Sequence, residues 1–159
     1  MVRFLFSFLL MLLPCLAQAQ GTMVSRHTGL AGGYSAEIRV SEHRHFSIYA
    51  QANIIRGADG AVGYTVFLRH GRSDGSPIYG DAAWSFGREL FFRPVPRDRV
   101  CSGLQCRWNV GVLAFSRAEF AQLAGTGIEL RLITSEGPID LNIPARVFAE
   151  AAAQAAAIL

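Results

Sequence analysis

The sequence of 159 residues contains no lysine, and its fifteen basic residues are all arginine. A phosphate-binding loop of the Gly-x-x-x-x-Gly-Lys type is therefore excluded. Charged residues make up 17% of the chain, and the formal net charge is only +3. Nucleic-acid binding usually requires a concentrated basic stripe, so we expect no nucleic-acid partner.

Long hydrophobic runs are also scarce, and the one that stands out lies at the N-terminus. Arg3 precedes a mainly apolar run over residues 4–13, and Pro14 and the small-residue ending Ala17-Gln18-Ala19 follow. The run is shorter than the roughly 20 apolar residues that span a bilayer. This pattern predicts a signal peptide over residues 1–19, cut after Ala19. We therefore expect a periplasmic or secreted protein whose mature chain has no transmembrane segment.

Cysteine is rare, with three in the chain. Cys15 lies inside the predicted signal peptide, which leaves Cys101 and Cys106 in the mature protein. An even pair in an oxidising compartment predicts a disulfide bond. That bond would leave no free thiol in the mature protein, which excludes a cysteine nucleophile. We also expect no cofactor.

Most of the mature sequence alternates between apolar and polar residues with a period of two, as half-buried strands do. We expect strands near residues 34–40, 46–54, 62–68, 78–86, 90–93, 107–115, 128–132 and 139–143. Residues 20–33 are small and polar and indicate a flexible lead-in, so residues 34–159 should form a single β-rich domain. Turn signals at short intervals without βαβ spacing favour an antiparallel β-sandwich or open barrel.

Two segments have helical signals instead. Ser116 and Glu119 have the spacing of a capping box, which opens a short helix that we expect to end at Gly125. Pro144 begins an alanine-rich C-terminal helix. Its apolar side would contain Val147, Phe148, Ala151 and Ala155. The predicted fold class is mainly β, with one short helix and a C-terminal helix.

The most basic stretch of the chain is a candidate ligand-binding surface. Arg93, Arg97 and Arg99 share odd positions, so an extended chain would place them on one face, and Arg107 lies beyond the cysteine pair. Guanidinium groups held in this way suit phosphates or carboxylates. The alternative, which we favour, is a solvated edge strand whose charges prevent aggregation. The nearby aromatic residues are interpreted as core: Trp84, Phe86, Phe91, Phe92 and Trp108.

A metal site is a second candidate. His43 and His45 would project to the same side of an extended segment and could share one ion. Spacing does not decide whether Glu42, His27 or His70 would supply a third ligand. The alternative is a polar loop before the strand that begins near Phe46, and this is the interpretation we favour.

The C-terminal part, from Arg97 to the end, combines the cysteine pair CSGLQC, the helical segment AEFAQLAGTG, the turn SEGP and the segment IPARVFAEA. In this outline it resembles uncharacterised secreted or lipid-anchored β-sandwich proteins of proteobacteria and, more distantly, the invasion-associated locus B family. The resemblance implies an exported, non-catalytic domain of a bacterial envelope, and it transfers no functional residues.

These observations lead to one main expectation about function. We expect an exported envelope protein that acts as a non-catalytic binding or interaction module for an anionic envelope ligand or a protein partner. The alternative is a metal-dependent or hydrolytic periplasmic enzyme that uses His43 and His45.

Overall fold

The computed structural model describes residues 20–42, 45–72, 77–95, 99–102 and 105–159. Within these ranges the chain is mainly β, with antiparallel sheets and two α-helices. Neither of these helices has the length and apolar character that a membrane-spanning helix needs. The predicted signal peptide lies outside the described residues.

The larger sheet is built around two long central strands, β4 and β5, which pair along their whole length. Its eight described strands are β1 (Gly21–Val24), β2 (Ala31–Tyr34), β3 (Ile38–Glu42), β4 (Phe46–Arg56), β5 (Val62–Arg72), β8 (Phe92–Pro94), β9 (Arg99–Ser102) and β10 (Gln105–Phe115). β2 and β3 pair with different stretches of β4. β8 and β9 pair in the same way with different stretches of β10.

The smaller sheet has the described order β12-β11-β6-β7. Its strands are β6 (Gly80–Ser85), β7 (Arg88–Glu89), β11 (Ile128–Thr134) and β12 (Gly137–Ile143). The two helices, α2 (Arg117–Thr126) and α3 (Ala145–Ala156), flank β11 and β12 in the sequence. β6 also contacts β8, and β12 contacts β3, so the smaller sheet contacts two edge strands of the larger one.

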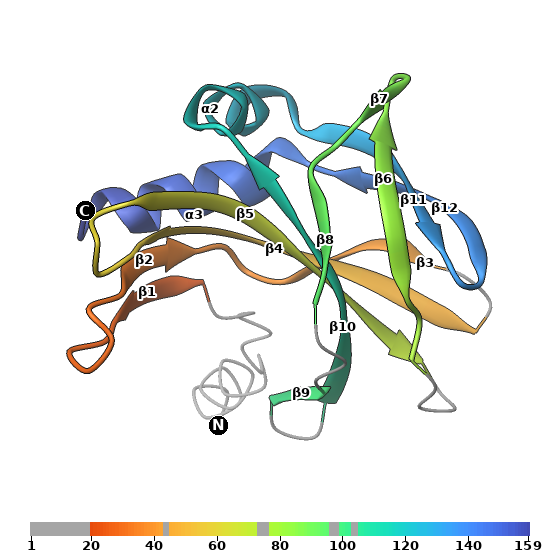
Figure 1. Ribbon diagram of the computed structural model, residues 1–159, viewed down its shortest axis with the longest axis horizontal. Helices are drawn as coiled ribbons and strands as arrows, with labels where there is room; N and C mark the ends of the chain where they lie inside the picture. The colour runs from red at the N-terminus through yellow and green to blue at the C-terminus, as the bar shows by residue number, and fades with distance from the viewer. Residues whose placement is uncertain (1–19, 43–44, 73–76, 96–98, 103–104) are drawn as a thin grey trace, which may run out of the picture.

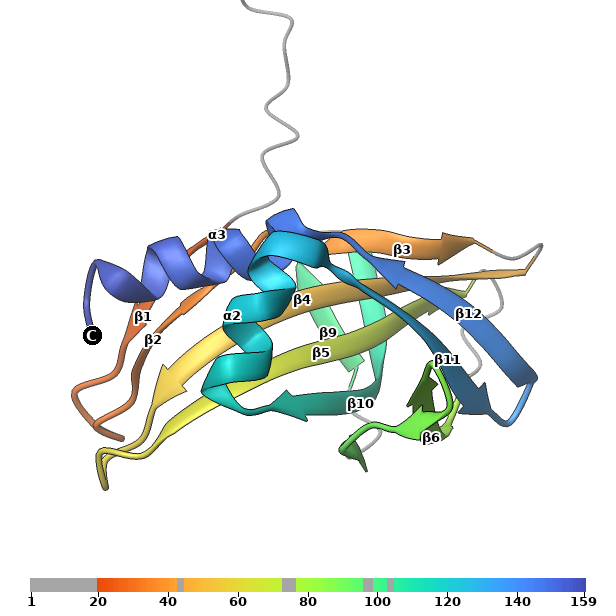
Figure 2. The same ribbon diagram turned by 90° about the horizontal axis from the view of Figure 1, so that it is seen from above.

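One face of the larger sheet forms the floor of the core. Figures 1 and 2 show α3 lying along one half of this sheet, while β11, β12 and β6 lie at the other half. Alternate residues of β4 are buried there: Ile48, Ala50, Ala52 and Ile54. The rings of Phe120 in α2 and Phe148 in α3 meet edge to face, with centroids 5.2 Å apart. The core therefore joins both helices to both sheets.

The predicted fold class is confirmed, since antiparallel strands dominate and the two helices form where they were expected. The capping box is also confirmed, because Glu119 N donates to Ser116 Oγ while Glu119 Oε2 accepts from Ser116 N. α2 runs one residue past the expected stop at Gly125 and is capped at Gly127. All four residues expected on the apolar side of α3 are buried.

The N-terminal region differs from the prediction in two ways. Residues 20–33, expected to be a flexible lead-in, instead contain β1 and most of β2. The strand expected over residues 34–40 is interrupted at residues 35–37, because β2 and β3 follow separate stretches of β4. Ser35 is fully buried at this break, and its Oγ accepts a hydrogen bond from Ala52 N at 3.0 Å.

Candidate functional site

The β6–β7 hairpin turns in only two residues. Trp84 pairs with Glu89 and Ser85 with Arg88, so Phe86 and Gly87 form the loop. Both have positive φ, 47° for Phe86 and 78° for Gly87. Positive φ at both positions is the backbone of a type I′ turn, in which Asn-Gly is the favoured pair. Phe86 therefore occupies a position where a bulky side chain is strained.

Three aromatic side chains of this segment are exposed, and the expectation that they belong to the core is wrong. The exposed fractions are 41% for Trp84, 92% for Phe86 and 70% for Phe91. Phe92 and Trp108, for which the same expectation was made, are partly buried. In Figure 1 the turn of the hairpin stands away from the rest of the molecule, above β6. The hairpin thus presents aromatic surface to solvent.

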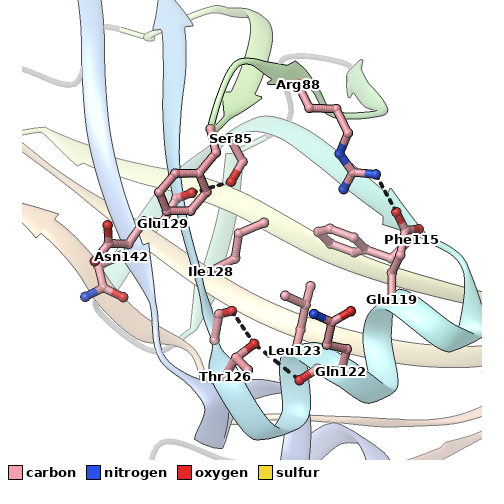
Figure 3. A pocket seen from close by; sticks show the side chains of 12 residues that line it. Ser85, Arg88, Phe115, Glu119, Gln122, Leu123, Thr126, Ile128, Glu129 and Asn142 are labelled. Atoms are coloured by element: carbon pink, nitrogen blue, oxygen red, sulfur yellow. Dashed lines mark hydrogen bonds and ion pairs between the residues drawn. The ribbon is translucent and has the colours of Figure 1, made fainter.

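A hollow of about 540 Å³ is lined by residues of the hairpin, of α2 and of the paired strands β11 and β12 (Figure 3). It is lined by Ser85, Phe86, Arg88, Phe115, Glu119, Gln122, Leu123, Thr126, Gly127, Ile128, Glu129 and Asn142. These residues come from parts of the sequence that are far apart. The hollow therefore exists only in the folded chain.

Two polar contacts hold the hairpin at the edge of this hollow. Ser85 Oγ donates to the backbone oxygen of Glu129 at 2.7 Å, and Arg88 Nη1 pairs with Glu119 Oε1 at 2.9 Å. The hydrogen bond from the Ser116 backbone, with those from the Arg88 and Ser116 side chains, lowers the pKa of Glu119 from 4.5 to about 2. Glu119 is thus ionised at neutral pH and links α2 to the hairpin.

A second hollow, of about 630 Å³, adjoins the first and shares Phe86, Glu129 and Asn142 with it. Its other lining residues are Val40, Trp84, Gly87, Leu130, Arg131, Asp140 and Leu141. Arg131 binds Asp140 through two hydrogen bonds, of 2.7 and 2.9 Å, and these lower the pKa of the Asp140 carboxyl. Phe86 and its neighbours thus border two connected hollows.

Glu129 differs from the other charged groups that line the hollows. It lies opposite Asn142 in the β11–β12 register, and both side chains are exposed. Within the described ranges, no hydrogen bond or ion pair engages its carboxylate, whereas Glu119 and Asp140 are each paired with an arginine. The site therefore combines exposed aromatic rings with an available carboxylate.

The predicted arginine surface is only partly described. Arg93 is exposed in β8, Arg97 lies outside the described residues, and only the backbone of Arg99 is described, opposite Trp108. Arg107 is 14% exposed, with Nε 3.0 Å from Glu37 Oε2 and its guanidinium carbon 3.6 Å from the centre of the Tyr49 ring. Arg107 is therefore already engaged by partners within the protein. The anion-binding surface stays a prediction.

Cys101 and Cys106 lie directly opposite each other in the antiparallel pairing of β9 and β10. This register is the arrangement in which a disulfide can join neighbouring strands, since it brings the two Cα atoms within the range that the bond spans. The disulfide itself remains a prediction.

Of the two predicted metal ligands, His43 lies outside the described residues, and His45 is exposed just before β4. Of the alternatives for a third ligand, His70 is buried, and its Nε2 accepts a hydrogen bond from Ile78 N at 2.8 Å. Within the described ranges, no group of three or more His, Cys, Asp or Glu side chains could hold a metal ion. The metal-dependent or hydrolytic alternative also stays a prediction.

The pair Phe86-Gly87 is the sequence signal that could have revealed the hairpin site. Two residues ending in glycine between extended segments predict a tight hairpin, and a phenylalanine in the usual place of asparagine is the anomaly. The residues across the hollows, Glu129 and Asn142, have no such signal. Comparisons of this chain with family models, with curated proteins and with solved structures found no match.

Proposed function

We propose that this chain is an exported, non-catalytic binding module, and that it contacts a partner protein through the Phe86 hairpin and the two hollows beside it. The observation that carries the proposal is Phe86 itself, a 92% exposed aromatic side chain at φ 47°. Export is supported by the predicted signal peptide over residues 1–19.

Burial of the ring does not offset the left-handed backbone conformation of Phe86. A left-handed conformation costs a residue other than glycine about 1–2 kcal/mol, and an exposed ring recovers almost none of this by burial. Residues in such conformations are often found at functional sites, where the strain serves binding or catalysis. A contact with a partner would explain why the ring is placed here.

The composition of the site fits a protein partner. Aromatic side chains are enriched at protein interfaces and often contribute most of the binding energy when they fill a pocket. Trp84 and Phe86 extend from the hairpin next to hollows, so a partner could cover the rings while its own side chains enter the hollows. This geometry favours a small, specific interface.

The substitution Phe86→Asn tests the proposal because stability and binding should change in opposite directions. Asparagine suits the first position of a type I′ turn, so we expect the free energy of unfolding to rise by about 1 kcal/mol. Binding should be lost, since the exposed ring is removed. Urea unfolding measures the first effect, and quantitative capture of partners from an envelope extract measures the second.

Phe91→Ser provides a matched control. It also removes an exposed phenylalanine, but Phe91 lines neither hollow. We expect this variant to capture the same partner as the unaltered protein. The proposal would be wrong if Phe86→Asn captured that partner equally well, or if Phe86→Asn destabilised the fold.

A further inference from the structure

We infer that the hairpin site accepts a basic side chain, arginine or lysine, from the partner protein. The inference rests on the proposed function and specifies what that site recognises. It depends on the charges that line the hollows, on the exposed rings, and on a similar contact elsewhere in this molecule.

The charge that remains available at the site is negative. The guanidinium groups of Arg88 and Arg131 are each paired with a carboxylate, Glu119 and Asp140 respectively. Glu129 lines both hollows and has no such partner among the described residues. A cationic group would neutralise Glu129, whereas an anionic ligand would be repelled by it.

The aromatic rings add a second contact for a cation. An ammonium or guanidinium group over the face of a tryptophan or phenylalanine ring gains cation–π energy, which is larger when water is excluded. Trp84 and Phe86 line the same hollow as Glu129. A guanidinium suits this combination, because it can stack on a ring and donate hydrogen bonds in its own plane to a carboxylate.

The molecule already contains this type of contact on the larger sheet. There the guanidinium of Arg107 lies over Tyr49, at 3.6 Å from the ring centre, and pairs with Glu37 at 3.0 Å. That contact therefore combines an aromatic ring, a glutamate and an arginine. The hairpin site presents the ring and the glutamate to solvent, and the third member is what a partner would supply.

Asn142 adds a neutral hydrogen-bonding group next to the carboxylate. Its register position is opposite Glu129, and its side-chain amide oxygen can accept from any donor of the ligand that Glu129 does not engage. The same group could bond a sugar hydroxyl, so a saccharide is the outcome against which the experiment must discriminate. The unpaired carboxylate favours the basic side chain.

The experiment is a titration of the ¹⁵N-labelled mature protein, followed by NMR. The probe is the peptide acetyl-Gly-Arg-Gly-amide, and the matched ligand control replaces arginine with citrulline, which has nearly the same shape but no charge. We expect the arginine peptide to shift the amide signals of residues 84–88, 129 and 142. A peptide with lysine in place of arginine should shift the same signals. The citrulline peptide should bind at least fivefold more weakly.

Two variants assign the effect to Glu129. Glu129→Gln keeps the shape but removes the charge, and it should weaken binding of the arginine peptide at least fivefold. Asp81→Asn is the matched control, because Asp81 is exposed on the same sheet but lines neither hollow, and it should leave binding unchanged. Raising the salt concentration should weaken the arginine complex and leave the citrulline complex nearly unaffected.

Several results would overturn the inference. These are equal binding of the arginine and citrulline peptides, unchanged binding by Glu129→Gln, or no shifts with the basic peptides. Shifts of the same signals by diacetylchitobiose, without shifts by the basic peptides, would identify a saccharide site instead. The proposed function is tested separately. Loss of partner capture by Phe86→Asn would support it even if the arginine and lysine peptides did not bind.

Discussion

Glu119 uses both of its carboxylate oxygens, and for two different purposes. Oε2 accepts hydrogen bonds from the Ser116 backbone and hydroxyl, at 2.9 and 2.8 Å, which closes the start of α2. Oε1 pairs with Arg88 of the hairpin. The spacing of Ser116 and Glu119 in the sequence predicted the first role, because the capping box is local. It could not predict the second, because Arg88 lies in a distant part of the chain.

The low pKa of Glu119 makes stability depend on pH. The group is ionised in the folded protein down to about pH 2, whereas its ordinary pKa is 4.5. Its stabilising contribution should therefore be complete above about pH 4.5 and be lost as the pH falls towards 2. Urea unfolding between pH 2 and 7 measures this, and Glu119→Gln should lack that part of the pH dependence.

Ser116→Ala provides an independent check of the same contact. Removing the hydroxyl that caps α2 should lower the free energy of unfolding by about 1 kcal/mol at neutral pH. An unchanged pH profile in Glu119→Gln, together with no loss of stability in Ser116→Ala, would contradict the importance of the capping box.

At the scale of elements, the strands that alternate clearly were predicted well, and the glycine-rich ones were not. β4, β10 and β12 formed where period-two alternation indicated them. β2 has the sequence AGGY, whose two glycines supply no pattern of apolar side chains. Its position is determined by pairing with β4 and by packing against α3, and neither can be read from local sequence.

The hairpin of β9 and β10 carries the predicted disulfide. Because Cys101 and Cys106 are opposite each other, we expect thiol labelling of the denatured, unreduced protein to find no free sulfhydryl. The double substitution Cys101→Ser and Cys106→Ser should lower the free energy of unfolding by only about 2 kcal/mol, since the bond closes a very short loop. Two labelled cysteines in the unreduced protein would show that the bond is absent.

At the scale of the whole molecule, α3 closes over β2 through a contact that only glycine permits. A Cβ atom at Gly33 would overlap the backbone nitrogen of Ala155. Gly33→Ala should therefore force α3 away from the sheet, and we expect a loss of about 1–3 kcal/mol, as for other overpacked cores. Thermal or urea unfolding measures the loss.

Gly63→Ala is the control for this substitution. Gly63 is exposed in β5, and the nearest atom to an added Cβ is the Ile55 carbonyl oxygen at 3.8 Å, which is ordinary contact. Its stability should change little. If both substitutions lowered the free energy of unfolding by similar amounts, the close approach of α3 would not be the reason why Gly33 cannot be replaced by a larger residue.

The candidate site shows why a whole-molecule feature is hard to predict. The sequence alone favours a core position for Trp84 and Phe86, because large aromatic residues are usually buried. Their exposure depends on the tight turn and on where β11, β12 and α2 lie. Glu129 differs from the other carboxylates of the site because Arg88 and Arg131 are paired with Glu119 and Asp140.

The packing of α3 on β2 also has a consequence for the order of folding. Gly33 and Ala155 lie far apart in the sequence, so this contact cannot form until all the residues between them are present. The pairs β4–β5 and β11–β12, which join neighbours in the sequence, can form earlier at a lower entropic cost. Until α3 docks, the glycine face of β2 stays uncovered, and closure of the N-terminal strands is expected to be a late step of folding.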